Sequence, residues 1–236
     1  MKVKFFLASL VFFFTGLTAF VSCSLGRDEG TVKIAIPSRS ALSRSRNSNS
    51  AARAVDGEYI SIFIVGDYED KKTVPFIDDE TAQTVTFDSI PAGASVRVVC
   101  TWNYPTDDPE EDDNRFLGCI GVSDEIVIVG GEEQTANVVM KDIGLTNEVA
   151  IDGSLSRIAK LFYASDDSDS PYSCISLPGP CSYEFTFTRD GTISFKTSSA
   201  ICEPSSISQA SIFSVTARIF FDGTEVLKLY VPDDSF

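Results

Sequence analysis

The chain has 236 residues, with 34 acidic and 19 basic side chains, a formal net charge of −15 and no histidine. This acidic balance argues against nucleic acid as a partner, because such binding depends on lysine and arginine neutralising phosphates. The lack of histidine excludes Ser-His-Asp and Cys-His catalysis and histidine-ligated metal sites, while an apolar fraction of 43% is enough for a hydrophobic core.

The N-terminal segment has the features of a bacterial secretion signal. A basic start at residues 1–4 precedes an apolar run over 5–21 and then small residues. The sequence FVSC at 20–23 resembles the bacterial lipobox, with phenylalanine first as in relaxed forms found in spirochaetal lipoproteins. In that family the cysteine becomes the first mature residue and carries acyl chains that anchor it in a membrane. The resemblance implies a signal peptide over 1–22, lipidation of Cys23 and the membrane as a partner.

Two other interpretations of this segment stay open. A plain signal peptide, cut after Ser24, would leave no lipid anchor. An uncleaved membrane span is the other, although the apolar run over 5–21 lies at the lower edge of the roughly 17–25 residues that a spanning helix needs. The lipoprotein interpretation predicts a place in the cell envelope, at the outer membrane or cell surface, or on the periplasmic face.

Residues 23–30 are predicted to be a polar tether, and the chain beyond them shows strand patterns separated by turns. No long window has a 3.6-residue apolar period, and turn signals recur about every 8–12 residues. Both features predict an all-β sandwich. The expected strands are 31–36, 58–65, 84–87, 94–102, 116–122, 126–129, 135–140, 157–164, 183–189, 192–197, 211–221 and 224–231.

Four pieces of the first half carry a family resemblance: GTVKI at 30–34, the Arg/Ala-rich run ending at Val55, VTFDSIPAG at 85–93 and GGEEQTANVVM at 130–140. Their order is similar to the prealbumin-like or carboxypeptidase-regulatory-like β-sandwich modules of treponemal and other bacterial surface lipoproteins. The resemblance covers about half of the mature chain. It implies an Ig-like antiparallel β-sandwich domain over 31–142, with no catalytic residues to carry over.

A second, smaller β domain is predicted over residues 154–236. The stretch 143–153 is expected to be a linker, because two glycines and two acids stand there between strand patterns. Beyond it, Asp190-Gly191 and Asp222-Gly223 are strong signals for two hairpins. The alternative is that these strands add to the first domain.

An arginine- and serine-rich stretch over 37–55 is expected to be a mobile loop of the first domain, because it has too few apolar residues to offset its ordering entropy. A second interpretation is an electrostatic contact with anionic lipid or glycan near the anchor. Residues 23–55 carry a net charge of +4, whereas 56–236 carry −21.

The predicted function is that of a lipid-anchored cell-envelope protein with a non-catalytic binding, adhesive or structural role, no cofactor, and a protein or glycan as ligand. Loops over 66–82 and 103–115 are the expected recognition elements. An Asp/Glu-based hydrolase or a calcium-dependent binding module is the alternative. Its acids cluster at 78–80, 107–113 and 166–169, none with EF-hand spacing.

Five cysteines besides Cys23 are expected in an oxidising compartment after export. A hairpin with a symmetric register would place Cys100 opposite Cys119, which predicts a disulfide there. Cys174 and Cys181 bracket a short Pro/Gly segment, and a local bridge between them is the simplest pairing. Cys202 would then remain as a buried thiol, or would replace one member of that pair.

Overall fold

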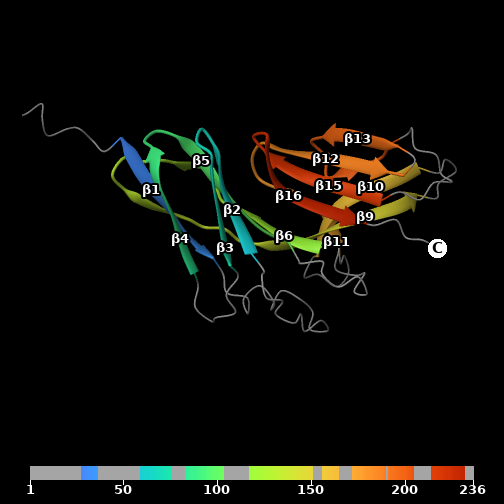
Figure 1. Ribbon diagram of the computed structural model, residues 1–236, viewed down its shortest axis with the longest axis horizontal. Helices are drawn as coiled ribbons and strands as arrows, with labels where there is room; N and C mark the ends of the chain where they lie inside the picture. The colour runs from blue at the N-terminus through green and yellow to red at the C-terminus, as the bar shows by residue number, and fades with distance from the viewer. Residues whose placement is uncertain are drawn as a thin grey trace, which may run out of the picture.

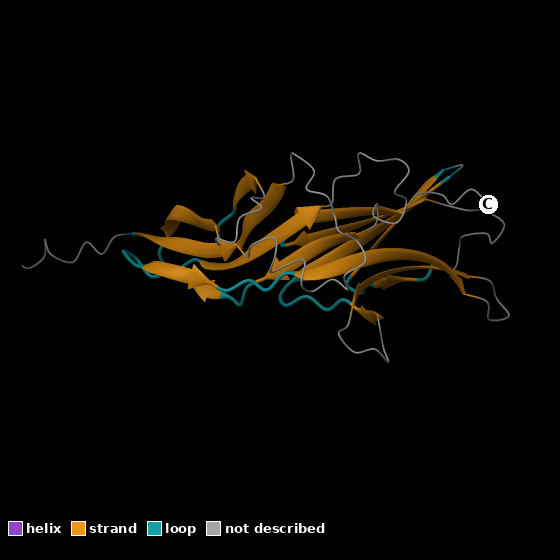
Figure 2. Ribbon diagram, turned by 90° about the horizontal axis from the view of Figure 1, so that it is seen from below, coloured by secondary structure: helices purple, strands orange, loops and turns teal. Residues whose placement is uncertain are grey.

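The structure is a computed structural model that describes residues 28–36, 59–75, 83–103, 117–150, 156–164, 172–189, 191–204 and 214–231 (Figure 1). Within these ranges all regular structure is β-strand (Figure 2). The predicted all-β class is therefore confirmed.

The described strands form three sheets. The first sheet has the order β4-β1-β8, with bounds Gln83–Pro91, Glu29–Ile36 and Glu133–Ala136. The central sheet has the order β11-β10-β9-β6-β5-β2-β3, with bounds Tyr172–Cys174, Ser156–Ala164, Lys141–Ala150, Leu117–Val122, Ser95–Asn103, Tyr59–Gly66 and Asp70–Pro75; β7 (Ile126–Val127) pairs with β5, and β14 (Ile201–Cys202) with β10. The third sheet has the order β13-β12-β15-β16, with bounds Thr192–Thr197, Cys181–Thr188, Ser214–Phe221 and Thr224–Val231.

Two hydrophobic cores lie on opposite faces of the central sheet. The first core lies between the first and central sheets and includes Phe87 and Ile62, whereas the second core lies between the central and third sheets and includes Phe185 and Phe63. Because side chains alternate along a strand, the neighbours Ile62 and Phe63 of β2 contribute to different cores. This explains why β2 is an almost unbroken apolar run, YISIFIVG.

The predicted linker over 143–153 has to be corrected. Residues 143–150 belong to β9, which pairs with β10 from Ile143 to Ala150 in the middle of the central sheet. Gly144 had suggested a break, but it lies under an aromatic ring: a Cβ there would come within 2.5 Å of Phe162 Cζ. Close packing, not a turn, therefore accounts for this glycine.

The strands after this point divide between two sheets. Strands β10, β11 and β14 extend the central sheet, in line with the alternative in which later strands add to the first unit. Strands β12, β13, β15 and β16 form the third sheet, and their hairpins were expected from the two Asp-Gly signals. In the β15–β16 turn, Asp222 and Gly223 have φ values of 45° and 87°, the positive pair that a tight hairpin turn favours.

Two smaller expectations also need correction. The predicted loop over 66–82 contains β3, an edge strand with a largely polar sequence, DKKTVP, that has no apolar alternation to reveal it. The strand pairs of the described residues are antiparallel as expected, with one exception: β1 pairs with β8 in parallel, with Thr31 opposite Glu133.

The molecule is elongated, and its two cores follow one another along the long axis. Strand β1 begins at one end, and the third sheet lies toward the other end (Figure 1). The elongated shape is seen again in the second view (Figure 2). No helix in the described part of the chain is long and apolar enough to cross a membrane.

Candidate functional site: a groove between the two cores

Most of the residues singled out from the sequence lie outside the described ranges. These are Cys23 with the signal peptide, the arginine-rich stretch 37–55, and the acidic clusters at 78–80, 107–113 and 166–169. Of the two expected recognition loops, 103–115 lies outside the described ranges except for Asn103, and 66–82 is described only as far as residue 75. Within the described ranges, no group of three or more Cys, Asp or Glu side chains is arranged to hold a metal ion.

The register of the β5–β6 pair removes the basis for the predicted Cys100–Cys119 bridge. Cys100 lies opposite Gly121, and Cys119 lies opposite Trp102, so the two cysteines are diagonal rather than facing neighbours. Diagonal positions are about 7–8 Å apart, beyond the roughly 7 Å that a disulfide spans between Cα atoms. No disulfide joins any of the five cysteines in the described ranges.

Both of these cysteines are buried side chains of the first core. Burial raises the pKa of the Cys100 thiol to about 12, so the reactive thiolate is scarce at neutral pH. Cys119 Sγ donates a hydrogen bond to Asp142 Oδ1 at 2.7 Å, which links β6 to β9. We therefore assign both thiols to the packing of the first core.

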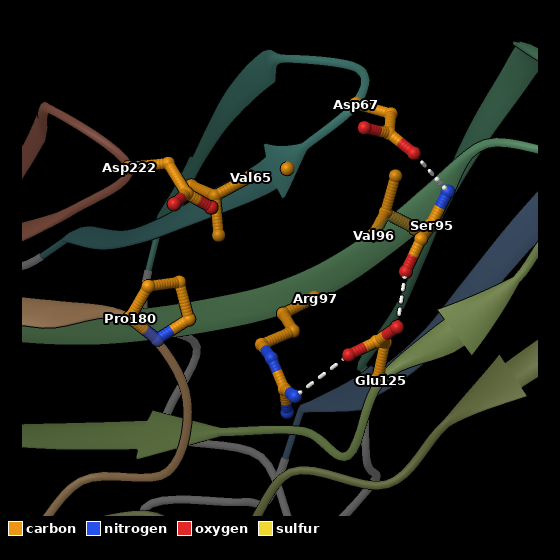
Figure 3. Close-up of a pocket in the computed structure, with 9 residues that line it drawn as sticks. Val65, Asp67, Ser95, Val96, Arg97, Glu125, Pro180 and Asp222 are labelled. Carbon is orange, nitrogen blue, oxygen red and sulfur yellow. Dashed lines mark hydrogen bonds and ion pairs between the residues drawn. The ribbon is translucent and has the colours of Figure 1, made fainter.

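A groove of about 340 Å³ lies where the two cores meet, and we call it the junction groove. Its lining residues come from the end of β2, the start of β5, the segment before β7, the β11–β12 connection and the β15–β16 turn (Figure 3). They are Val65, Gly66, Asp67, Ser95, Val96, Arg97, Glu125, Pro180 and Asp222.

The ladder between β2 and β5 sets the direction of the groove. Val65 is the partner of Arg97, so both side chains point to the face that carries the third sheet. Gly66, with φ of 124°, ends β2 so close to β5 that a Cβ would come within 2.5 Å of the Ser95 carbonyl oxygen. The Asp222 turn of the third sheet closes the groove from the other side.

A chain of polar contacts runs along one wall of the groove (Figure 3). Asp67 Oδ2 accepts a hydrogen bond from the Ser95 amide at 2.9 Å. The Ser95 hydroxyl donates to Glu125 Oε1, and Arg97 Nη2 forms an ion pair with Glu125 Oε2 at 3.0 Å. The Arg97 side chain is only 19% exposed, whereas that of Glu125 is 55% exposed. The arginine is therefore the mostly buried partner of the ion pair, and the carboxylate is the one that lies toward solvent.

The opposite wall is formed by the connection from β11 to β12. At Gly179, with φ of 89°, a Cβ would lie 2.8 Å from Arg97 Nε, so the glycine lets the main chain lie directly against the guanidinium. Pro180 follows and lines the groove. The groove therefore carries one arginine and three carboxylates over an apolar base of valine and proline, and its net charge is −2.

Sequence reasoning missed this site for a physical reason. Its residues lie in five separate segments that only the β2–β5 register and the folding back of the third sheet bring together. The Asp222-Gly223 signal identified the turn correctly, but nothing local indicates that this turn lines the same groove as Arg97.

Comparison with known proteins assigns the chain to no group. No protein-family model matches the sequence, and no curated protein or solved structure matches it either. The described fold defines an all-β protein with three sheets and two cores. The resemblance to prealbumin-like lipoprotein modules remains a prediction.

Proposed function

We propose that this protein is a lipid-anchored component of the cell envelope with a non-catalytic binding role, and that the junction groove is where it binds a protein ligand. The observation that carries the proposal is the groove itself, a polar recess between two cores that are joined by one continuous sheet. Ligand sites commonly lie at such junctions.

The shape of the molecule supports the anchoring part of the proposal. With a lipid on Cys23, the start of β1 at Glu29 would lie at most about 20 Å from the membrane surface. Because β1 begins at one end of the long axis, the third sheet would then project away from the membrane (Figure 1). The groove would lie between these ends, open to a partner.

The charge and shape of the groove favour a basic side chain as the group that is bound. Asp67, Glu125 and Asp222 outnumber Arg97, and the ion pair already engages one of the three carboxylates. Val65 and Pro180 offer apolar surface to the aliphatic stem of a lysine or arginine, and Asp67 and Asp222 are the lining carboxylates left for its charged end.

The binding part can be tested by calorimetric titration of the full-length protein with the peptide Gly-Lys-Lys-Lys-Gly at low salt. We expect Asp222→Asn to weaken binding about fivefold, as expected for the loss of one partly screened charge interaction. The matched control is Glu69→Gln. Glu69 is an exposed acid two residues after Asp67, but it does not line the groove. Equal effects of both substitutions, or equal binding of Gly-Glu-Glu-Glu-Gly, would contradict the proposal.

The anchoring part can be tested by the intact mass of the protein purified from its membrane fraction. We expect a mature species that starts at an acylated Cys23, and Cys23→Ala should abolish both the acylation and membrane recovery. A plain peptide mass that starts near Leu25 would contradict the lipid anchor without affecting the groove.

A further inference from the structure

The segment that forms one wall of the junction groove carries a cysteine at each end. Cys174 ends β11 in the central sheet, and Cys181 begins β12 in the third sheet. Between them, Ile175 is buried and its amide donates to the Leu161 carbonyl at 3.2 Å. Pro180 lines the groove, and Gly179 lies against Arg97. A bond between the cysteines would therefore join two sheets around the wall, and would not only close a surface loop.

Both thiols face the same interior. Cys174 and Cys181 pack, partly buried, against the second core, and Leu177 between them does the same. Tyr183 lies beside both: burial raises the pKa of its hydroxyl, and the neighbouring Cys181 and Cys174 thiols raise it further. This agrees with the packing of both thiols against the second core.

The position of Cys202 disfavours it as the partner of Cys174. Strands β11 and β14 lie along the same edge of β10, where Cys174 is opposite Phe162 and Cys202 is opposite Ala159. Three residues along a strand correspond to about 10 Å, more than the roughly 7 Å that a disulfide spans between Cα atoms.

From this geometry we infer that Cys174 and Cys181 form a redox-sensitive tie between the central and third sheets, which fixes the wall of the junction groove when it is oxidised. The two thiols lose two protons and two electrons to a disulfide oxidant such as oxidised glutathione, which becomes two molecules of the thiol. An S–S bond forms between the cysteines, and the oxidant's S–S bond breaks. In the reduced protein, residues 175–180 are held only by their packing and hydrogen bonds.

The effect of the disulfide on ligand binding rests on the proposed function, but the disulfide itself does not, because its test needs no ligand. The full-length protein is equilibrated with reduced or oxidised glutathione, alkylated and mapped by peptide mass, and hydrogen exchange is followed over residues 175–181. We expect a Cys174–Cys181 crosslink in the oxidised sample, with Cys202 alkylated only after unfolding. Exchange over 175–181 should slow about tenfold on oxidation.

Two variants separate the tie from a general effect of oxidant. Cys202→Ala should keep the crosslink and the change in exchange, whereas Cys174→Ser should lose both. A crosslink that includes Cys202, or equal exchange in the oxidised and reduced wild type, would overturn the inference. Failure of the lysine peptide to bind, with redox-dependent exchange intact, would overturn the proposed function and leave this inference standing.

Discussion

The two cores share the central sheet but are held together in different ways. Around the first core, polar side chains connect the sheet edges. Lys72 of β3 donates a hydrogen bond to the Thr86 carbonyl of β4. Next to β7, the Gln134 side chain donates to the Val127 carbonyl and accepts a hydrogen bond from the Val129 amide. The interior of this core is mainly isoleucine and valine.

The second core depends on aromatic packing. Its third-sheet half contains Tyr183, Phe185, Phe187 and Phe221, all buried. Packing becomes looser toward the edge strand β13, where Ile193 is 40% exposed although it lies opposite the fully buried Phe187. The difference implies that the second core is more sensitive to loss of a large side chain, and the first to loss of a polar bridge between its sheets.

The largest effect is expected from Phe185→Ala, which should lower the free energy of unfolding by about 3–5 kcal/mol, because it removes a fully buried ring and leaves a cavity. Trp102, the single tryptophan, lies in the first core, so its fluorescence reports unfolding on the face of the central sheet opposite to Phe185. Since the central sheet is continuous, we expect the denaturant midpoint of Trp102 fluorescence to shift with the midpoint of circular dichroism.

Phe87→Ala in the first core is the matched variant, since Phe87 is equally buried. It should also move both probes together, but by less than Phe185→Ala does, because the first core depends less on aromatic packing. A Trp102 transition that stays at its wild-type midpoint in Phe185→Ala, while circular dichroism shows a separate earlier step, would mean that the two cores unfold independently.

The parts of the fold that the sequence reveals are those that depend on local patterns. The alternation in β15 and the Asp222-Gly223 turn are properties of a few consecutive residues, and both were predicted correctly. Strand β3 was missed because an exposed edge strand rich in lysine needs no apolar alternation. In β9, Gly144 looked like a break in the strand. A glycine is needed there because the Phe162 ring of the neighbouring strand packs against it, and this contact is not visible in the local sequence.

The candidate site was harder to anticipate because it depends on register. The offset that places Cys100 opposite Gly121 is set by how β5 and β6 pair, and no local feature of either strand specifies it. The same holds for the groove, where Arg97 and Asp222 line one recess only after the third sheet has packed on the central sheet.

An intermediate effect is expected from Gly144→Ala, which tests the part of the central sheet that was mistaken for a linker. The added methyl group would overlap the Phe162 ring, and such overpacking costs about 1–3 kcal/mol of unfolding free energy. Gly191→Ala is the control, because a Cβ at Gly191 meets no atom within 4 Å. Equal melting temperatures for the two variants would argue against tight packing of the Phe162 ring over Gly144.

The smallest effect is expected from Lys72→Met, which keeps the long apolar stem but removes the bridge between the edges of the first and central sheets. The loss should be about 1 kcal/mol, below the roughly 1.5–3 kcal/mol usual for a hydrogen bond with a charged group, because this contact is only partly buried. Lys71→Met is a close control, because each ammonium lies 4.8 Å from a phenylalanine ring centroid, Lys72 over Phe87 and Lys71 over Phe63. Since the ring contact is common to both, the difference between the two variants in chemical denaturation isolates the Thr86 hydrogen bond. If Lys71→Met costs as much as Lys72→Met, polar bridging does not distinguish the first core from the second.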